Sequence, residues 1–448
     1  MIQAERYLEE IPMWAAKKNS LEAIRDFLGR MGHPDREMKI VHVAGTNGKG
    51  SVCTFLASIL RQAGYDTAVF ISPHLINVRE RFLHNGSPVG ETDFLGAFET
   101  VKGLSQAMAA DGYAWPTYFE FLFYMFLEMA RGWKPDAVIL ETGLGGLLDT
   151  TNVVEHPLIS VITSVSMDHM QYLGSAIQEI AASKAGILKY KTPVVYDGNC
   201  AESRQVIENT GQRLCCAMYP VEDKDIQVVS RDGAGMDVVM NMEGGSLKIQ
   251  VPSQADYQAI NAGVAVRAAQ VINGMGGFRI SKKAMEEGIR TSFWPGRMEE
   301  VLPGVFLDGA HNTGGMEALT RTIVRMQGIK GRPVFLMFGV AEDKEYHQMI
   351  EELCSRVAVS RVIVAHMDTE RSAKAGVVAG EFEKRLSCPV KAFDTVAEAW
   401  DCLIQTKGED LAFCAGSLYL VGEVKALLEE RSGTHGRLAD WQISGLVD

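Results

Sequence analysis

The sequence has 448 residues, of which 47% are hydrophobic and 22% are charged, and its formal net charge is −12. This length allows two or three domains with large cores, the composition is that of a soluble globular protein, and the negative charge argues against a broad nucleic-acid-binding face. No apolar run reaches transmembrane length, the acidic N-terminus predicts no signal peptide, and the eight cysteines form no C-x-x-C pair, so we expect a cytoplasmic protein without disulfides or zinc.

The first predicted elements are helices within residues 1–36, followed by a glycine-rich turn between a strand and a helix. Residues 39–43 are predicted to form a buried strand, and residues 52–62 carry apolar positions with helical spacing. A turn in this place leaves backbone N–H groups free at the positive end of the helix dipole, which is a phosphate site. Lys49 would reach the outer phosphates and Ser51 a Mg²⁺ ion. The alternative is an ordinary glycine-rich turn, because the extra Gly50 between these two residues departs from the general P-loop pattern.

Three further predicted strands each deliver polar side chains to their carboxyl ends. The strand predicted over residues 67–71 is followed by Ser72, the strand over residues 136–140 by Glu141, and the strand over residues 158–163 by Asp168 and His169. In open α/β sheets ligands bind at that edge, and carboxylates there suit a metal or phosphate site. The alternatives are a plain turn residue at Ser72 and a solvated Glu141 in a glycine-rich turn.

Two charged residues lie within otherwise apolar helical patterns. Glu120 begins the helix predicted over residues 118–131, which follows another over residues 91–110. A buried Glu120 needs a partner or a ligand, although the helix dipole alone would favour it there. Lys184 lies on the apolar face of the helix predicted over residues 175–188. It either reaches the surface along its stem or has lost its charge and has a function.

The second half predicts a small annex and then a second α/β alternation. Residues 225–230, 237–242 and 247–251 alternate as antiparallel strands, residues 257–272 and 281–291 as helices, and residues 305–307, 334–338, 362–365 and 411–414 as strands of a new sheet. The segment Trp294-Pro295-Gly296-Arg297 breaks structure between them. We therefore predict an α/β fold: a P-loop-containing parallel-sheet domain with the antiparallel annex over residues 1–294, and a smaller doubly wound α/β domain over residues 295–448.

A series of short motifs runs through the whole chain. They occupy residues 45–51 (GTNGKGS), 72–75 (SPHL), 117–120 (TYFE), 141–146 (ETGLGG), 148–152 (LDTTN), 168–169 (DH), 184–187 (KAGI), 295–297 (PGR), 308–312 (DGAHN) and 416–422 (GSLYLVG). In order and spacing these motifs resemble the folylpolyglutamate synthase/dihydrofolate synthase family of the Mur ligase superfamily. The extra Gly50 is that family's own form of the P-loop.

The resemblance implies an ATP-dependent ligase that joins L-glutamate to a folate or to dihydropteroate through an acyl phosphate. It implies nucleotide contacts from Gly45, Thr46, Asn47, Gly48, Lys49, Gly50, Ser51, Asn261, Arg297, Asp308 and His311, and pterin-substrate contacts from Thr117, Tyr118, Phe119, Glu120, Leu148, Asp149 and Thr150. One Mg²⁺ would be held by Ser51 with the phosphates and a second among Ser72, Glu141 and His169. The implied catalytic residues are Lys49, Glu141, His169 and Lys184, and Lys184 matches the family lysine that is carbamylated to N6-carboxylysine.

Two positions depart from the family pattern, and two other functions compete. Leu147 replaces the usual Arg, which removes a positive charge near the substrate, and Ser183 replaces the usual Glu before Lys184. A cell-wall Mur ligase would carry a separate N-terminal domain, whereas only residues 1–44 precede the glycine-rich turn. A P-loop protein that binds ATP only as a regulator would not need the polar strand ends. We expect a monomer with small-molecule partners, without nucleic acid or membrane, and leave the choice between dihydropteroate and folate open.

Overall fold

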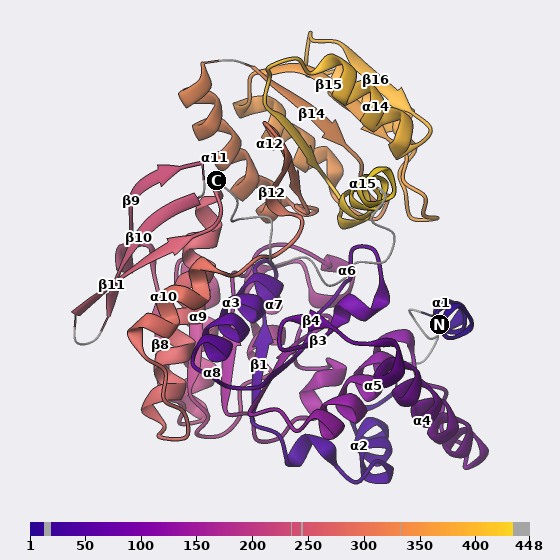
Figure 1. The fold of residues 1–448 in the computed structure, drawn as a ribbon, viewed down its shortest axis with the longest axis vertical. Helices are drawn as coiled ribbons and strands as arrows, with labels where there is room; N and C mark the ends of the chain where they lie inside the picture. Colours follow the sequence, from indigo (N-terminus) through magenta and orange to yellow (C-terminus); the bar gives the residue numbers. More distant parts are fainter. Residues whose placement is uncertain (13–18, 234, 243–244, 332, 433–448) are drawn as a thin grey trace.

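The computed structural model describes residues 1–448 except 13–18, 234, 243–244, 332 and 433–448. Within the described residues the strands form an eight-stranded, a three-stranded and a six-stranded sheet. Figure 1 shows the six-stranded sheet with its helices above the other two sheets. We call the part built on the six-stranded sheet, from β12 to α15, the C-terminal unit. The domain boundary at residues 294 and 295 stays a prediction.

The eight-stranded sheet is parallel except at one edge. Its order is β4-β3-β2-β5-β1-β6-β7-β8. The six strands β2-β5-β1-β6-β7-β8 pair in parallel, whereas β3 and β4 at the edge are antiparallel. The strands are β1 (Ile40–Ala44), β2 (Thr67–Phe70), β3 (Phe82–His84), β4 (Ser87–Pro88), β5 (Ala137–Glu141), β6 (Ile159–Ile162), β7 (Val194–Asp197) and β8 (Met218–Val221). The central strands β1, β2, β5 and β6 are buried along their whole length because both faces of the sheet are covered. The predicted parallel sheet is confirmed.

Helices cover both faces of this sheet. One face carries α3 (Lys49–Gln62), α9 (Asp256–Gly274) and α10 (Lys282–Arg290), and the other carries α1 (Ile2–Glu10), α2 (Leu21–Arg30), α4 (Glu91–Ala110) and α5 (Tyr118–Trp133). The alternation of side chains along β1 explains this division, since Val41 and Val43 join the first core and Ile40 joins the second. A smaller core beyond β6 packs α7 (Ile177–Ala185) and α8 (Ala201–Arg213).

The predicted annex is present as an antiparallel sheet. It consists of β9 (Ile226–Asp232), β10 (Gly235–Met242) and β11 (Gly245–Val251). Val238, Met240 and Ile249 are buried in the same core as α3, α9 and α10. The annex is therefore packed on the large sheet's helical layer and stands to one side of the molecule (Figure 1).

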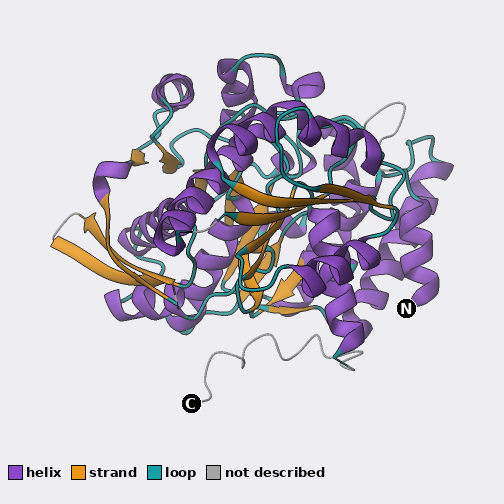
Figure 2. Cartoon of the chain, turned by 90° about the horizontal axis from the view of Figure 1, so that it is seen from above, coloured by secondary structure: helices purple, strands orange, loops and turns teal. Residues whose placement is uncertain are grey.

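The C-terminal unit is a second α/β sandwich. Its strand order is β12-β13-β17-β14-β15-β16, and only β12 (Arg297–Leu302) is antiparallel to its neighbour. The other strands are β13 (Val305–Asp308), β14 (Val334–Phe338), β15 (Val359–Ala365), β16 (Val390–Phe393) and β17 (Ala412–Ala415). One face packs α11 (Thr313–Lys330), α12 (Tyr346–Arg356) and α13 (Ala375–Glu383), and the other α14 (Val396–Thr406) and α15 (Leu418–Arg431). The view from above shows helices on both sides of the strands (Figure 2).

Most sequence expectations agree with these elements, with small differences. The helix predicted over residues 175–188 covers only Ile177–Ala185. Arg297, expected within a linker, begins the edge strand β12. Part of the helical region expected within residues 1–36, residues 13–18, lies outside the described residues. Among the helices that the structure describes, none combines the length and the apolar character needed to cross a membrane.

Candidate functional site

The sheet order brings the predicted strand ends together. β2, β5, β1 and β6 are neighbours, so their carboxyl ends place Ser72, Glu141, the glycine-rich turn and the segment before His169 along one edge. The backbone N–H of Ser72 donates to Oε2 of Glu141 at 3.0 Å. On the other side of the turn, the N–H of Thr46 donates to the carbonyl of Ser164 at 2.7 Å. The turn is therefore fixed between two neighbouring strand ends.

Two glycines let other segments approach the turn closely. Gly48 has a positive φ of 88°, and a Cβ on it would overlap the amide of Asn261 on α9. A Cβ on Gly50 would lie 2.7 Å from the ring of Trp294. The glycines at these positions thus let α9 and the segment before β12 contact the start of α3 directly.

Lys49 and Ser51 stand at the N-terminal end of α3. The ammonium of Lys49 donates to the carbonyls of Gly45 and Thr46 at 3.1 Å each and lies 3.9 Å from Oε1 of Glu141. The buried hydroxyl of Ser51 accepts a hydrogen bond from Gln258 at 3.2 Å. A cation and the free N–H groups of a helix start meet here, which is the chemistry of a phosphate site.

Glu141 and His169 provide the oxygen and nitrogen donors beside this turn. Burial raises the pKa of Glu141 to about 6, against the lowering effects of Lys49 and the N–H of Ser72. Burial also lowers the pKa of His169 to about 4, so its ring is neutral near pH 7. Among the described residues no three His, Cys, Asp or Glu side chains gather around one metal position. Mg²⁺ usually keeps several waters and uses one or two carboxylates together with substrate phosphates, and Glu141 is one such carboxylate close to Lys49 of the turn.

Lys184 on α7 is buried within the same site. Its side chain is 2% exposed, and its Nζ donates to the carbonyl of Gly45 at 2.8 Å. Burial first, and then the neighbouring Lys49, lowers the pKa of Lys184 to about 7. The amine therefore does not reach the surface, which excludes the alternative that Lys184 extends into solvent.

Side chains of the C-terminal unit contact this edge directly. Asp168 accepts hydrogen bonds from Nζ of Lys344 at 2.9 Å and from Nδ2 of Asn312 at 2.8 Å. Asn312 also exchanges two hydrogen bonds, of 3.0 and 3.1 Å, with the side chain of Asn47 in the turn. Burial alone would raise the pKa of Asp168, but Lys344, with smaller contributions from two histidines, holds it well below its usual range. Neither Lys344 nor Asn312 was among the sequence-predicted residues.

Asp308 and His311, expected to bind the nucleotide, follow β13 in the C-terminal unit. The carboxylate of Asp308 accepts from the hydroxyl of Tyr257 at 2.5 Å and from the N–H groups of Met298 and Ala310 at 3.0 and 2.9 Å. Nδ1–H of His311 donates to the carbonyl of Gly309 at 2.8 Å, and burial lowers the pKa of this histidine to about 4. Asp308 is the last residue of β13, so its hydrogen bonds connect the end of β13 with α9 and with the start of β12.

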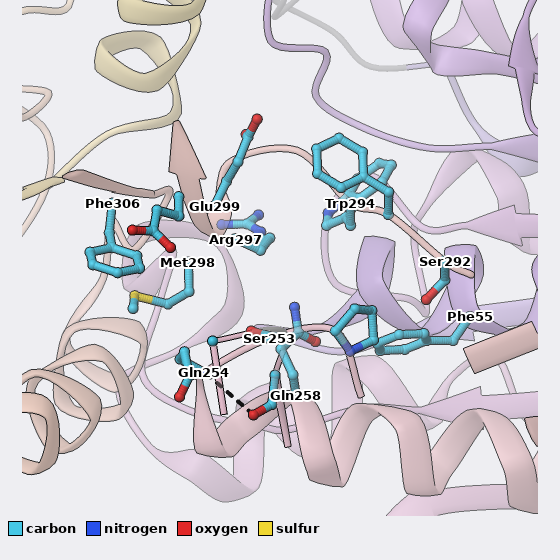
Figure 3. Close-up of a pocket in the computed structure, with 15 residues that line it drawn as sticks. Phe55, Ser253, Gln254, Gln258, Ser292, Trp294, Arg297, Met298, Glu299 and Phe306 are labelled. Carbon is cyan, nitrogen blue, oxygen red and sulfur yellow. Dashed lines mark hydrogen bonds between the residues drawn. The ribbon is translucent and has the colours of Figure 1, made fainter. Parts of the chain in front are cut away.

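A cavity of about 150 Å³ lies beside the turn between the two parts of the molecule. Trp294 and Arg297 line one side, and Phe55, Ser253 and Gln258 lie across from them (Figure 3). The amide of Asn261, which was predicted to bind nucleotide, donates to Gln258 at 3.0 Å. The cavity thus joins aromatic rings, one guanidinium and amide groups next to the candidate phosphate site.

The start of α5 uses a capping box. The N–H of Thr117 donates to Oε2 of Glu120 at 2.8 Å, and the N–H of Glu120 donates to Oγ1 of Thr117 at 3.4 Å. Asn19 donates to the same Oε2 at 2.8 Å. The buried Oε1 of Glu120 has no hydrogen-bond partner within the described part of the chain. Helix capping therefore accounts for one carboxylate oxygen and leaves the other, which is buried, without a partner among the described residues. Tyr118 and Phe119 follow on the same helix.

The loop after β5 is shaped by Asp149. Its carboxylate accepts from the N–H groups of Leu144 and Thr151 at 2.8 and 3.0 Å and from the Thr151 hydroxyl at 2.6 Å. Thr150 is buried, whereas Leu147 and Leu148 are 52% and 70% exposed. Of the three residues predicted to bind the pterin substrate in this loop, Asp149 thus fixes the loop's shape, Thr150 is buried and Leu148 faces outward. Leu147, the neighbour of Leu148, faces outward as well.

Two family models match the chain over most of this region. The Mur ligase middle domain matches residues 117–269, and the Mur ligase, glutamate ligase domain matches residues 296–418. Together they include Glu141, Lys184, Arg297 and His311.

The whole chain is also similar to known proteins. It is 33% identical to a dihydrofolate synthase/folylpolyglutamate synthase of Bacillus subtilis over 420 residues, covering 92% of this chain and 95% of that one. The crystal structure of a folylpolyglutamate synthase from Thermotoga maritima superposes with a TM-score of 0.81 and 29% identity, covering 98% of both chains. An Escherichia coli structure in complex with DHPP and ADP gives a TM-score of 0.81 with 28% identity, over 96% of this chain and 98% of that one.

Proposed function

The chain belongs to the folylpolyglutamate synthase/dihydrofolate synthase family of the Mur ligase superfamily, and we propose that it adds L-glutamate to folates with consumption of ATP. The observation that carries this proposal is that three strands with polar carboxyl ends, β2, β5 and β6, lie in the sheet beside β1, which ends in the glycine-rich turn. A C-terminal unit that contacts the same turn supports it. Dihydropteroate is the second acceptor that this family uses, and we include it.

The proposed reaction has two chemical steps. The acceptor's carboxylate oxygen attacks the γ-phosphorus of ATP, ADP leaves, and an acyl phosphate forms. The amino nitrogen of glutamate then attacks the acyl carbon, the amide forms with loss of a proton, and inorganic phosphate leaves. Phosphoryl transfer between two anions requires positioning and neutralisation of charge more than covalent help from the protein.

Lys49 supplies the protein's own positive charge at the transferred phosphoryl group. Among the described residues its ammonium donates to two backbone carbonyls and forms a long ion pair of 3.9 Å with Glu141, so it can turn to the phosphates at little cost. Ser51 would hold one Mg²⁺ with the phosphates, and Ser72, Glu141 and His169 would hold a second. When bound, these ions stabilise the negative charge that moves between the phosphate oxygens. The neutral ring of His169 and the buried carboxylate of Glu141 suit that role.

We propose that Lys184 carries a carbamate. A neutral amine is the form that reacts with CO₂, and burial keeps a large share of Lys184 neutral near pH 7. The product, N6-carboxylysine, is an anion, and the ammonium of Lys49 in the same site would balance its charge. This change replaces a buried cation by an oxygen donor.

We place the base and ribose of ATP in the cavity beside the turn, between Trp294 and Gln258, with Arg297 beside them. Asn261 and His311 border the nucleotide in this proposal, and Asp308 positions the segment that carries Arg297. Gly45, Asn47, Gly48 and Gly50 would offer backbone N–H groups to the phosphates. Thr46 lies in the same turn, but its N–H donates to the carbonyl of Ser164. Domain closure around this site would exclude water from the acyl phosphate.

We assign the acceptor to the start of α5 and the loop after β5. The residues are Thr117, Tyr118, Phe119, Glu120, Leu148, Asp149 and Thr150. Oε1 of Glu120 is an acceptor suited to the N–H groups of a pterin. Leu147, where the family usually has Arg, offers an apolar surface in place of a charge. We further propose that the protein is a monomer and is located in the cytoplasm. Size-exclusion chromatography of the purified protein tests the oligomeric state.

A direct assay tests the function. The purified protein is incubated with ATP, Mg²⁺, L-glutamate and either tetrahydrofolate or dihydropteroate, and products are resolved by mass. We expect ADP and phosphate to form only when glutamate and an acceptor are both present, and Lys49→Ala to serve as the inactive control. Glutamate-independent ATP hydrolysis, or ligation only to a cell-wall precursor, would contradict the proposal.

A further inference from the structure

Arg81 is a buried cation beside the candidate active site that the proposed mechanism does not use. It ends a short 3₁₀ helix, Val78–Arg81, which follows the Ser72 loop. The backbone carbonyl of Arg81 accepts from the N–H of Ile71 at 3.1 Å, which ties it to the end of β2. Its side chain is 5% exposed. The fold thus holds a guanidinium next to the strand end that carries Ser72.

Within the described residues Arg81 has no ion-pair partner. Its Nε–H donates to Nδ1 of His74 at 2.8 Å, and its guanidinium lies 5.3 Å from the ring centre of Tyr118. The two terminal nitrogens donate no hydrogen bond among those residues, and neither is sealed from solvent. The carboxylates of Glu141 and Glu80 act on Arg81 electrostatically without direct contact, and burial still lowers the pKa of Arg81. A buried charge without an anion in contact is costly. An anion that binds here would offset that cost.

The histidine partner fixes which part of Arg81 is available. The Nε–H group of Arg81 can only donate, so Nδ1 of His74 is the acceptor of this hydrogen bond. The Nε–H of Arg81 is used by this bond. The two terminal amino groups remain as a planar pair, the geometry that binds both oxygens of one carboxylate.

The surroundings of Arg81 belong to the site. Tyr118 lies in the segment assigned to the acceptor, and both Glu141 of β5 and Tyr419 of α15 interact electrostatically with Arg81. Tyr419 comes from the C-terminal unit and is 39% exposed. Arg81 therefore lies between the acceptor segment, the predicted metal ligand and the opposite unit.

We propose that Arg81 binds a carboxylate of a glutamate unit that does not itself react. The inference rests on the proposed function. Two sources present this carboxylate: the α-carboxylate of the terminal glutamyl residue of a folate, and a carboxylate of the incoming glutamate. Dihydropteroate distinguishes them, because its only carboxyl group is the one that reacts. If the acceptor is the source, Arg81 acts as a specificity residue that favours glutamylated folates.

The test compares Arg81→Met, which keeps the stem but removes the charge, with Arg81→Lys, which keeps the charge but loses the planar pair. Arg79→Met is the matched control, because Arg79 lies in the same 3₁₀ helix and its Nε donates to Asn77 at 3.3 Å. KM values for glutamate and for the acceptor are measured with tetrahydrofolate and with dihydropteroate. Thermal unfolding of each variant checks that the fold is kept.

We expect Arg81→Met to raise one KM by roughly 10- to 100-fold, the range for a lost hydrogen-bonded charge pair, with a smaller rise in Arg81→Lys and none in Arg79→Met. A rise only for tetrahydrofolate assigns the carboxylate to the acceptor, and a rise for glutamate with both acceptors assigns it to the incoming glutamate. A folded, active Arg81→Met with unchanged KM values overturns this inference alone. A wild-type protein that joins glutamate to neither acceptor overturns the proposed function and the inference with it.

Discussion

Replacing Lys184 by alanine is expected to abolish ligation because the proposed function requires this residue as a carbamate. The fraction of Lys184 that is available as a neutral amine follows from its pKa in the structure. Burial lowers the lysine pKa from 10.5 to about 7, which corresponds to about 5 kcal/mol for keeping the ammonium charged. At pH 8 about nine-tenths of such amines are neutral, compared with about 0.3% of ordinary lysines. The amine that CO₂ requires is therefore about 300 times more abundant at Lys184 than at an exposed lysine.

The assay follows the carbamate itself as well as turnover. Protein incubated with ¹³C-labelled bicarbonate and Mg²⁺ should show one carbamate carbon signal by NMR, and Lys184→Ala should lack it. Lys189→Ala is the control, because Lys189 follows α7 and donates to Oδ1 of Asn152 at 2.9 Å, away from the glycine-rich turn. We expect Lys189→Ala to keep both the signal and turnover. Acetate, which fills the space left in Lys184→Ala, should restore part of the activity.

The reasoning would be refuted by a bare amine at Lys184 in a sample that is fully active. A carbamate signal that survives in Lys184→Ala would also refute it, since the modified lysine would then be another one. Removal of CO₂ from wild-type protein should lower turnover reversibly.

Three further substitutions test the remaining assignments. Lys49→Ala should reduce turnover by at least tenfold, about 1.4 kcal/mol of barrier, with an unchanged unfolding midpoint; more than about a tenth of wild-type turnover would exclude its role at the phosphoryl group. Glu141→Gln should lower turnover and shift the Mg²⁺ titration to higher concentration, because it removes a charged donor; superimposable titrations would exclude the second metal. Arg297→Ala should weaken ATP binding more than folate binding in calorimetry, and equal ATP affinities would show that Arg297 does not contact the nucleotide.

The sequence predicts the central part of the fold because its strands are short apolar runs between clear breaks. Residues 39–43 and 136–140 became β1 and β5 with shifts of a single residue. Several missed strands lie at or next to sheet edges: β8 is an edge strand that contains Pro220, β7 is its neighbour, and β12 is an edge strand with two adjacent glutamates after a Pro-Gly break. Such edge strands carry weak signals, since only one neighbour and one face constrain them.

The candidate site was predictable where it follows from strand ends. Ser72 and Glu141 are joined by a hydrogen bond because parallel strands end at one edge, and the assignment of His169 to the same metal site stays a prediction. Lys344 was missed because its partner Asp168 is 176 positions away in the chain and no local pattern links them. Arg81 was missed for another reason. It attracts attention because it is buried without an ion-pair partner among the described residues, and a sequence alone does not show which side chains contact one another.

The hydrogen bonds between Asn47 and Asn312 give the molecule a thermodynamic property. Asn47 belongs to the phosphate-binding turn and Asn312 to the C-terminal unit, and Asn312 also holds Asp168 together with Lys344. If the nucleotide binds this turn as proposed and favours the attached C-terminal unit, nucleotide binding and attachment are thermodynamically coupled. By reciprocity, a change that weakens attachment by some factor weakens nucleotide affinity by the same factor, and the bound nucleotide strengthens attachment equally. The measured affinity for the nucleotide can therefore report how firmly the C-terminal unit is attached in variants whose substitutions lie far from the phosphates.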